Sequence, residues 1–227
     1  MLLHLTFLDV IDYIGTYAFA VSGIRLAAAK RFDWFGAYVC GLATAVGGGT
    51  LRDIMLGLTP FWMNQPSYLV ITGLALLTVV IFGKKVIHMR NTMFVFDAIG
   101  LALFNIVGIE KTLAVGFPFW VAIIMGTFTG AAGGVIRDVL LNRVPLIFCS
   151  ELYAVACVIG GLIYWVCVRL GVDIITTQII AAVAVILARL LATRYHLALP
   201  MLRGSDIDLK DLEDDVTNPD DIKQKPV

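Results

Sequence analysis

Two similar polar motifs occur in this chain of 227 residues, each inside a long apolar stretch. The first is GGGTLRD at residues 47–53, and the second is GGVIRD at residues 133–138. With a constant shift of 85 in the numbering, residues 12–60 and 97–145 match at 17 of 49 positions without a gap. The matched residues include glycine, aspartate, arginine and proline, which chance similarity between apolar helices would not produce. The sequence therefore predicts a duplicated unit.

The composition indicates an integral membrane protein. Hydrophobic residues make up 59% of the chain and charged residues only 15%, whereas soluble domains average about 25% charged residues. Apolar runs of about 20 residues are typical of helices that span a bilayer. Seven such spans are predicted, near residues 7–28, 34–58, 66–83, 92–114, 117–141, 150–169 and 174–196. The predicted fold class is therefore all-α, with seven transmembrane helices.

The duplication and the helix count together predict an inverted repeat. Repeat one covers about residues 7–83 and repeat two about 92–169, each with three helices, and an odd number of spans reverses the orientation of the second copy. A seventh helix at about 174–196 has no counterpart and completes a transmembrane domain over residues 1–197. In inverted-repeat proteins, the solute pathway runs near the midplane between interrupted helices. Residues 198–227 are rich in acidic residues and are predicted to be a disordered cytoplasmic tail.

The basic residues predict the orientation in the membrane. Seven spans put nine basic residues of the loops and helix ends on one side and two on the other, and the richer side faces the cytoplasm. The nine are Arg25, Lys30, Arg31, Lys84, Lys85, Arg90, Arg143, Arg194 and Arg203, and the two are Lys111 and Arg169. We therefore expect a multi-pass protein of the inner (plasma) membrane, with its N-terminus outside and its C-terminus in the cytoplasm.

Four charged residues are predicted to form two ion pairs inside the membrane. Because depth in the membrane follows from position along a helix, Asp12 is expected at the depth of Arg52, and Asp97 at the depth of Arg137. An unpaired buried charge costs several kcal/mol, so each arginine needs a carboxylate. We therefore expect the pairs Asp12–Arg52 and Asp97–Arg137, one at each end of a central constriction.

The aspartates that follow the two arginines have a different predicted role. Asp53 and Asp138 are adjacent in sequence to Arg52 and Arg137, and neighbouring residues of a helix point about 100° apart. We therefore expect both carboxylates to face the solute pathway.

The glycines of both motifs are predicted to bend or unwind the second and fifth helices. Backbone without side chains is flexible there and exposes carbonyl oxygens, which suit a dehydrated cation. The candidate glycines of the pathway are Gly47, Gly48, Gly49, Gly133 and Gly134. Thr44 and Thr129 precede them in both copies. Their hydroxyls either line the pathway or bond back to their own helix.

The remaining polar residues carry fewer predictions. No catalytic arrangement and no metal-ligand spacing is recognisable, so the sequence predicts no enzyme, no cofactor and no metal beyond a permeant potassium or sodium ion. No nucleic-acid partner is expected. Arg189 in the last helix either pairs with an acidic residue or reaches toward the cytoplasm. The basic residues Lys30, Arg31, Lys84 and Lys85 set the topology, and contact with anionic membrane lipid is the alternative.

The duplicated three-helix unit, with its paired glycine and Arg-Asp motifs and a seventh helix, resembles the trimeric intracellular cation (TRIC) channel family in its prokaryotic branch. The resemblance covers roughly residues 5–197. It implies a homotrimer in which each protomer holds its own pore, lined by kinked second and fifth helices, and it implies conduction of monovalent cations, chiefly potassium. By position the kinks fall at residues 47–49 and 133–134, and Ala132 stands where the first motif has Gly47.

A second class of function is consistent with the same pattern. An inverted repeat with broken helices is also a design of transporters, and Arg52 or Arg137 could hold the carboxylate of a small zwitterion such as glycine. A scaffold without transport would leave the buried charges without a purpose.

Overall fold

The structure is a computed structural model that describes residues 6–88, 92–148, 152–195 and 197, without the side chains of 83–88 and 92. The predicted acidic tail at 198–227 lies outside the described residues. Within them the fold is all-helical. Seven long helices are present: α1 (Phe7–Ala29), α2 (Trp34–Met55), α4 (Ser67–His88), α5 (Thr92–Ala114), α6 (Phe119–Leu140), α7 (Tyr153–Arg169) and α8 (Ile174–Arg194). Their bounds agree with the seven predicted spans to within a few residues.

Two short elements extend the repeat beyond the region that sequence matching covered. The short helix α3 (Phe61–Asn64) follows α2, and the 3₁₀ helix η1 (Leu146–Phe148) follows α6 at the equivalent position of the second copy. Repeat one therefore comprises α1, α2, α3 and α4, and repeat two comprises α5, α6, η1 and α7, whereas α8 has no counterpart.

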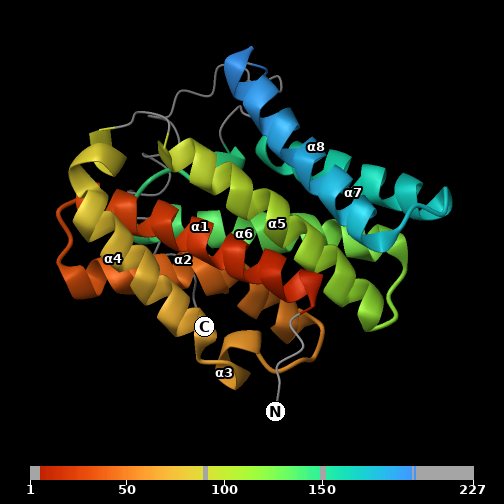
Figure 1. Cartoon of the computed structure of the whole chain (residues 1–227), viewed down its shortest axis with the longest axis horizontal. Helices are drawn as coiled ribbons and strands as arrows, with labels where there is room; N and C mark the ends of the chain where they lie inside the picture. The colour runs from red at the N-terminus through yellow and green to blue at the C-terminus, as the bar shows by residue number, and fades with distance from the viewer. Residues whose placement is uncertain (1–5, 89–91, 149–151, 196, 198–227) are drawn as a thin grey trace, which may run out of the picture.

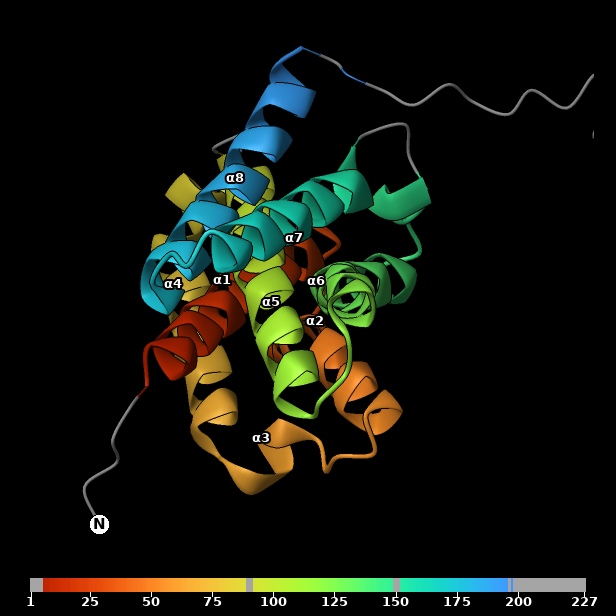
Figure 2. The ribbon, with the colours of Figure 1, turned by 90° about the vertical axis from the view of Figure 1, so that its right-hand side faces the viewer.

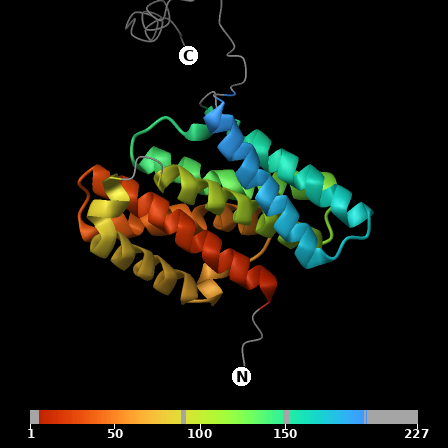
Figure 3. The same cartoon turned by 45° about the horizontal axis from the view of Figure 1, so that its top comes forward.

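The arrangement of the helices follows the duplication. Within repeat one, α1 packs on α2 and α4, and the equivalent helix α5 packs on α6 and α7. The repeats join through equivalent helices, α1 against α5 and α2 against α6. Figure 1 shows α4 at one edge of the bundle and α7 with α8 at the opposite edge, and Figure 3 shows the same order from a tilted view. A pseudo-two-fold relationship between the repeats is therefore evident in the packing.

An aromatic pair marks the contact between the two repeats. Phe19 of α1 and Phe104 of α5 occupy equivalent positions, and their ring centroids lie 5.2 Å apart in an edge-to-face arrangement. Gly100 packs against the ring of Phe19, and its equivalent Gly15 packs against the ring of Phe104. Residues that contact their own repeat equivalent lie beside the symmetry axis, so this cluster is the centre of the bundle.

Several helices have the length and apolar character that a membrane span requires. Among the described residues these are Phe7–Ala29, Met93–Ala114, Phe119–Leu140 and Ile174–Arg194, and shorter apolar helices occur at Ser67–Phe82 and Tyr153–Arg169. Many large apolar side chains face outward, such as Trp34, Phe35 and Ile81, which are 70%, 76% and 71% exposed. A bilayer provides the apolar surroundings that this surface requires.

Candidate functional site

The glycine motifs lie where α2 and α6 cross, and their role differs from the predicted one. Both helices are continuous through residues 34–55 and 119–140. No glycine within them has a positive φ angle. A Cβ atom at Gly48 would overlap the backbone carbonyl of Thr129, and one at Gly133 would overlap the carbonyl of Thr44. The two helices are therefore not unwound at these glycines, whereas bending stays a prediction. The glycines permit close contact between the helices.

The two threonines at this crossing bond to their own helices. The Thr44 hydroxyl donates to the Cys40 carbonyl oxygen at 2.6 Å, and the Thr129 hydroxyl donates to the Met125 carbonyl oxygen at 2.6 Å. Both threonines are fully buried. Of the two predicted alternatives, the structure shows the back-bonded one.

Each repeat carries a cluster of charged and tyrosine side chains near the end of its second helix. The first-repeat cluster comprises Asp12, Arg52, Asp53, Tyr68 and Lys111. The second-repeat cluster comprises Asp97, Arg137, Asp138, Tyr153 and Arg189. The first four members of each cluster are repeat equivalents, whereas Lys111 comes from α5 and Arg189 from α8. Figure 2 shows α3 at one end of the bundle, and the N–H of Phe61 in α3 bonds to Asp53 of the first-repeat cluster.

The predicted pair between Asp97 and Arg137 is present. The Arg137 guanidinium donates through Nη1 to Asp97 Oδ1, and the side chains of both residues are 0% exposed. The same Nη1 donates to the Ser22 hydroxyl of α1 at 2.9 Å. This arginine thus joins the second repeat to the first helix of the chain.

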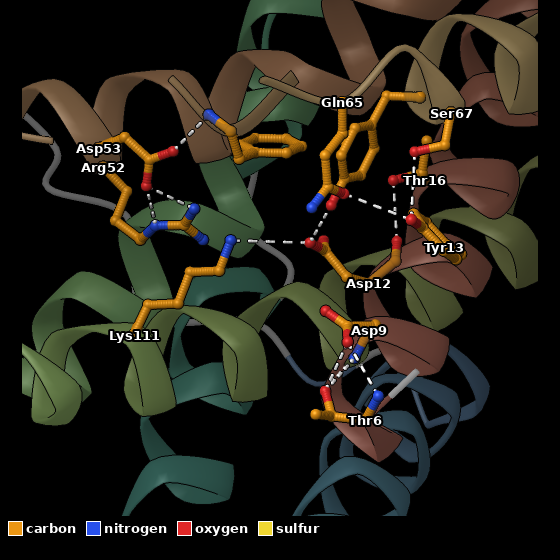
Figure 4. A network of polar contacts seen from close by, with 12 residues as sticks. Thr6, Asp9, Asp12, Tyr13, Thr16, Arg52, Asp53, Gln65, Ser67 and Lys111 are labelled. Carbon is orange, nitrogen blue, oxygen red and sulfur yellow. Dashed lines mark hydrogen bonds and ion pairs between the residues drawn. The ribbon is translucent and has the colours of Figure 1, made fainter. Parts of the chain in front are cut away.

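The predicted pair between Asp12 and Arg52 is absent from the part of the chain that the structure describes. Arg52 instead donates to its neighbour Asp53, from Nη2 to Oδ1 at 2.6 Å. Asp12 accepts a hydrogen bond from the Tyr68 hydroxyl at 2.8 Å, and its Oδ2 lies 3.7 Å from Lys111 Nζ. Figure 4 shows Lys111 reaching toward Asp12 while Arg52 turns toward Asp53. The prediction failed because Lys111 belongs to the other repeat, where it stands at the position equivalent to the uncharged Leu26.

The two aspartates expected to face a pathway are both held by hydrogen bonds, and Asp53 also lines the cavity beside Lys111. Asp53 Oδ2 accepts a hydrogen bond from the backbone N–H of Phe61 at 2.9 Å. Asp138 Oδ2 accepts one from the equivalent N–H of Leu146 at 3.3 Å. Arg137 Nε also donates to Asp138 Oδ1 at 2.9 Å. Each carboxylate therefore neutralises the preceding arginine and holds the start of the following short helix.

Lys111 is the cation of these clusters that reaches a cavity. Its side chain is 28% exposed, and its Nζ lies 4.9 Å from the centroid of the Phe61 ring. The adjoining cavity has a volume of about 420 Å³. Its lining residues are Asp9, Asp53, Leu58, Thr59, Phe61, Asn64, Gln65, Tyr68 and Lys111. The cavity therefore offers carboxylates, amides and one ammonium group to a small polar solute.

Arg189 is buried within the bundle. It is 0% exposed, so of the two alternatives predicted for it the structure does not show the side chain that reaches out of the bundle. Its guanidinium carbon lies 4.6 Å from the ring centroid of Tyr153 and 5.1 Å from that of Phe94. Sequence reasoning missed Tyr68, Tyr153 and the role of Lys111. Extending the repeat alignment to residue 68 would have paired the two tyrosines.

A further polar cluster that was not predicted joins α5 to α7 and α8. Glu110 Oε1 accepts hydrogen bonds from the Tyr164 hydroxyl and from Gln178 Nε2, the latter at 2.7 Å. This carboxylate ties α8 to the second repeat.

The fold and the paired clusters define a class: membrane proteins built from an inverted duplication of three helices, with a seventh long helix. Solved structures with this fold are similar over nearly their whole length. One, from a study of the structural basis for conductance through TRIC cation channels, has a TM-score of 0.78 and 34% identity, and covers 88% of this chain and 99% of its own. The TRIC channel orthologue from Rhodobacter sphaeroides has a TM-score of 0.79 and 32% identity, with coverages of 85% and 100%.

Family comparison gives the particular assignment. A family model described as "Glycine transporter" matches residues 9–84 and again residues 94–169, one match for each repeat. The "UPF0126 membrane protein" of Vibrio cholerae is 42% identical over 200 residues, which is 87% of this chain and 84% of that protein. The "UPF0126 inner membrane protein YadS" of Escherichia coli K12 is 39% identical over 193 residues, which is 84% of this chain and 93% of that protein. The chain belongs to the family of membrane proteins that this "Glycine transporter" model describes, and it is similar to the UPF0126 proteins. In structure it resembles the prokaryotic TRIC channels.

Proposed function

We propose that this protein is a monovalent cation channel that conducts chiefly potassium, with a pore inside each protomer along the crossing of α2 and α6. The observation that carries the proposal is the similarity to solved TRIC cation channels, at 34% and 32% identity over nearly their full length. The proposed pathway runs from one charged cluster to the other beside the crossing of α2 and α6, where direct backbone contact at Gly48 and Gly133 limits its width.

The charges of the first-repeat end support passage of cations. Arg52 is neutralised by Asp53, and Asp9 and Asp12 add two further carboxylates near Lys111. Three carboxylates against two cationic groups leave a formal charge of −1 at this mouth. A mouth of negative charge raises the local concentration of cations. An arginine beside a cation pathway would repel the ions, but here its charge is outweighed by the carboxylates.

The orientation and the assembly belong to the same proposal. The distribution of basic residues favours an N-terminus outside the cell. In that orientation, the cavity beside Lys111 faces the exterior, and the second-repeat cluster lies toward the cytoplasm. We propose a homotrimer, because the solved relatives are described as trimeric. Native mass spectrometry in mild detergent tests the assembly, and a monomer would contradict it.

The test of conduction uses purified protein in a planar bilayer. Unitary currents whose reversal potential follows a potassium gradient support the channel. If no unitary current appears while the protein is present in the bilayer in folded form, the channel proposal is wrong.

Transport of a small zwitterion is the second candidate, and two observations favour it. The family model that matches both repeats is described as "Glycine transporter", and the cavity beside Lys111 presents an ammonium group together with carboxylates. The structure changes which residue would hold the solute carboxylate. Arg52 and Arg137 are buried in their ion pairs, with side chains 1% and 0% exposed. Lys111 also lies near an aspartate, but its side chain is 28% exposed and lines the cavity, so Lys111 takes that role. Uptake of labelled glycine into vesicles, compared between the wild-type protein and Lys111→Met, tests this candidate.

A further inference from the structure

The two repeats place the same three residue types together but bond them differently. In the first repeat, the Tyr68 hydroxyl donates to Asp12 Oδ2 at 2.8 Å. In the second repeat, neither the Tyr153 hydroxyl nor Asp97 Oδ2 has a hydrogen-bond partner among the described residues, although both are buried. Asp97 is held by Arg137 instead. One aspartate is thus bonded by a tyrosine and its equivalent by an arginine.

The two aspartates also differ in which charged residues lie beside them. Where the tyrosine holds the aspartate, Arg52 bonds to Asp53, and Lys111 beside the aspartate opens on the cavity with 28% of its side chain exposed. Where the arginine holds it, Asp97 and Arg137 are both 0% exposed. The equivalent residues Asp12 and Arg52 are also buried, at 5% and 1% exposed, so the difference lies in Lys111, which connects the first-repeat cluster to the cavity.

Arg189 contacts the tyrosine of the second-repeat cluster and has no counterpart in the first repeat. It comes from α8, the helix without a repeat equivalent, and its guanidinium stacks on the rings of Tyr153 and Phe94. The position equivalent to Phe94 in the first repeat is Asp9, which has no ring. The cations of that cluster, Arg52 and Lys111, lie over the ring of Phe61 instead. Stacking on a cation holds an aromatic ring in place. The ring of Tyr153 thus lies against Arg189, and its hydroxyl has no hydrogen-bond partner among the described residues.

We propose that Asp12 and Asp97 exchange tyrosine for arginine partners in opposite phase, and that Arg189 is the positioning residue that holds the arrangement seen here. In inverted repeats, one repeat can rock or gate against the other around a fixed site, and such a motion would exchange the arrangements of the two equivalent clusters. In the exchanged state, Tyr153 bonds to Asp97, Arg52 pairs with Asp12, and the cavity beside Lys111 closes. The predicted Asp12–Arg52 pair would then belong to this second state. The exchange does not depend on which solute crosses.

The test measures the exposure of Lys111 directly. Full-length protein in lipid nanodiscs is acetylated with a water-soluble reagent, and mass spectrometry gives the modification rate of Lys111 relative to the exposed Lys30. Arg189→Gln releases the ring of Tyr153, so we expect this ratio to fall by a factor of about three or more, since residues within one network couple by such amounts. General loosening of the structure would raise the ratio, so the direction of the change separates the proposal from a folding defect.

Two further variants make the test specific. Arg189→Gln combined with Tyr153→Phe should return the ratio to the wild-type value, because phenylalanine cannot donate to Asp97. Arg194→Gln removes an exposed arginine from the last turn of the same helix and should leave the ratio unchanged. The proposal is overturned if Arg189→Gln leaves the ratio unchanged or raises it, if Tyr153→Phe does not reverse the effect, or if Arg194→Gln reproduces it.

Discussion

Gly48 of α2 lies directly against the backbone carbonyl of Thr129 on α6, with no room for a Cβ atom between them. The equivalent contact, between Gly133 and the Thr44 carbonyl, lies on the other side of the same crossing. These reciprocal contacts hold the backbones of the two repeats against each other at the motif glycines. The proposed pathway depends on this crossing.

Alanine at Gly48 or Gly133 should therefore destabilise the protein and reduce potassium flux. The added methyl group meets a backbone atom that cannot swing aside, and such overpacking costs about 1–3 kcal/mol. Thermal unfolding in detergent and flux into vesicles measure the two effects. Gly73→Ala on α4 is the matched control, because a Cβ atom there meets nothing within 4 Å, and it should be neutral or stabilising by up to about 1 kcal/mol. Equal stability of all three variants would contradict the close crossing.

Neutralising the two equivalent aspartates should have unequal effects. Asp97→Asn removes the charge opposite a fully buried arginine, and breaking such a pair costs on the order of 3 kcal/mol. Asp12→Asn removes a charge opposite a lysine whose side chain is 28% exposed, and pairs that solvent screens contribute about 1 kcal/mol or less. Unfolding temperatures of the two variants give the comparison. A larger loss for Asp12→Asn would show that the assigned partners are wrong.

Lys111→Met should raise potassium conductance most strongly at low salt. Removing the ammonium makes the first-repeat mouth more negative, and the effect of a charge fades as salt screens it. The Debye length is about 30 Å at 0.01 M and about 3 Å at 1 M, so single-channel recordings at about these two concentrations should show an increase that nearly vanishes at the higher one. Lys111→Arg keeps the charge and serves as control. An unchanged conductance at low salt would place the ion path away from Lys111.

Glu110→Gln should weaken the attachment of α8 to the second repeat. The change removes the charge from the acceptor of two hydrogen bonds, from Tyr164 and Gln178, and hydrogen bonds to charged groups contribute about 1.5–3 kcal/mol each. Hydrogen exchange of α8 backbone amides should become faster, while exchange in α2 should stay unchanged. Equal acceleration in both helices would contradict a local role for this cluster.

The fold was predictable from the sequence because its signals are local and repeated. Apolar runs located the seven long helices to within a few residues, and the constant shift between the two copies identified the equivalent elements. The contact between Asp97 and Arg137 followed from depth alone, because both lie within one repeat at matching distances from the helix middle. The same argument failed for Asp12 and Arg52, because Lys111 of α5 lies beside Asp12. The position equivalent to Lys111 in repeat one is the uncharged Leu26, so the repeat gave no sign of this contact.

The roles of the glycines and of the two arginine-adjacent aspartates could not be read from the sequence. A glycine run has the same appearance whether it breaks a helix or admits a second helix, and only the position of α6 decides for Gly48. The angle between neighbouring helical residues suggested that Asp53 points away from Arg52. In the structure, the N–H of Phe61 after the turn holds one oxygen of Asp53. The long side chain of Arg52 folds back and donates to the other oxygen.

The most direct test of the proposed function is a bilayer recording of the purified protein under a potassium gradient, paired with uptake of labelled glycine into vesicles of the same preparation. We predict unitary currents that reverse near the potassium equilibrium potential, together with no saturable uptake of glycine. Saturable glycine uptake without unitary potassium current would contradict the channel and support the transporter.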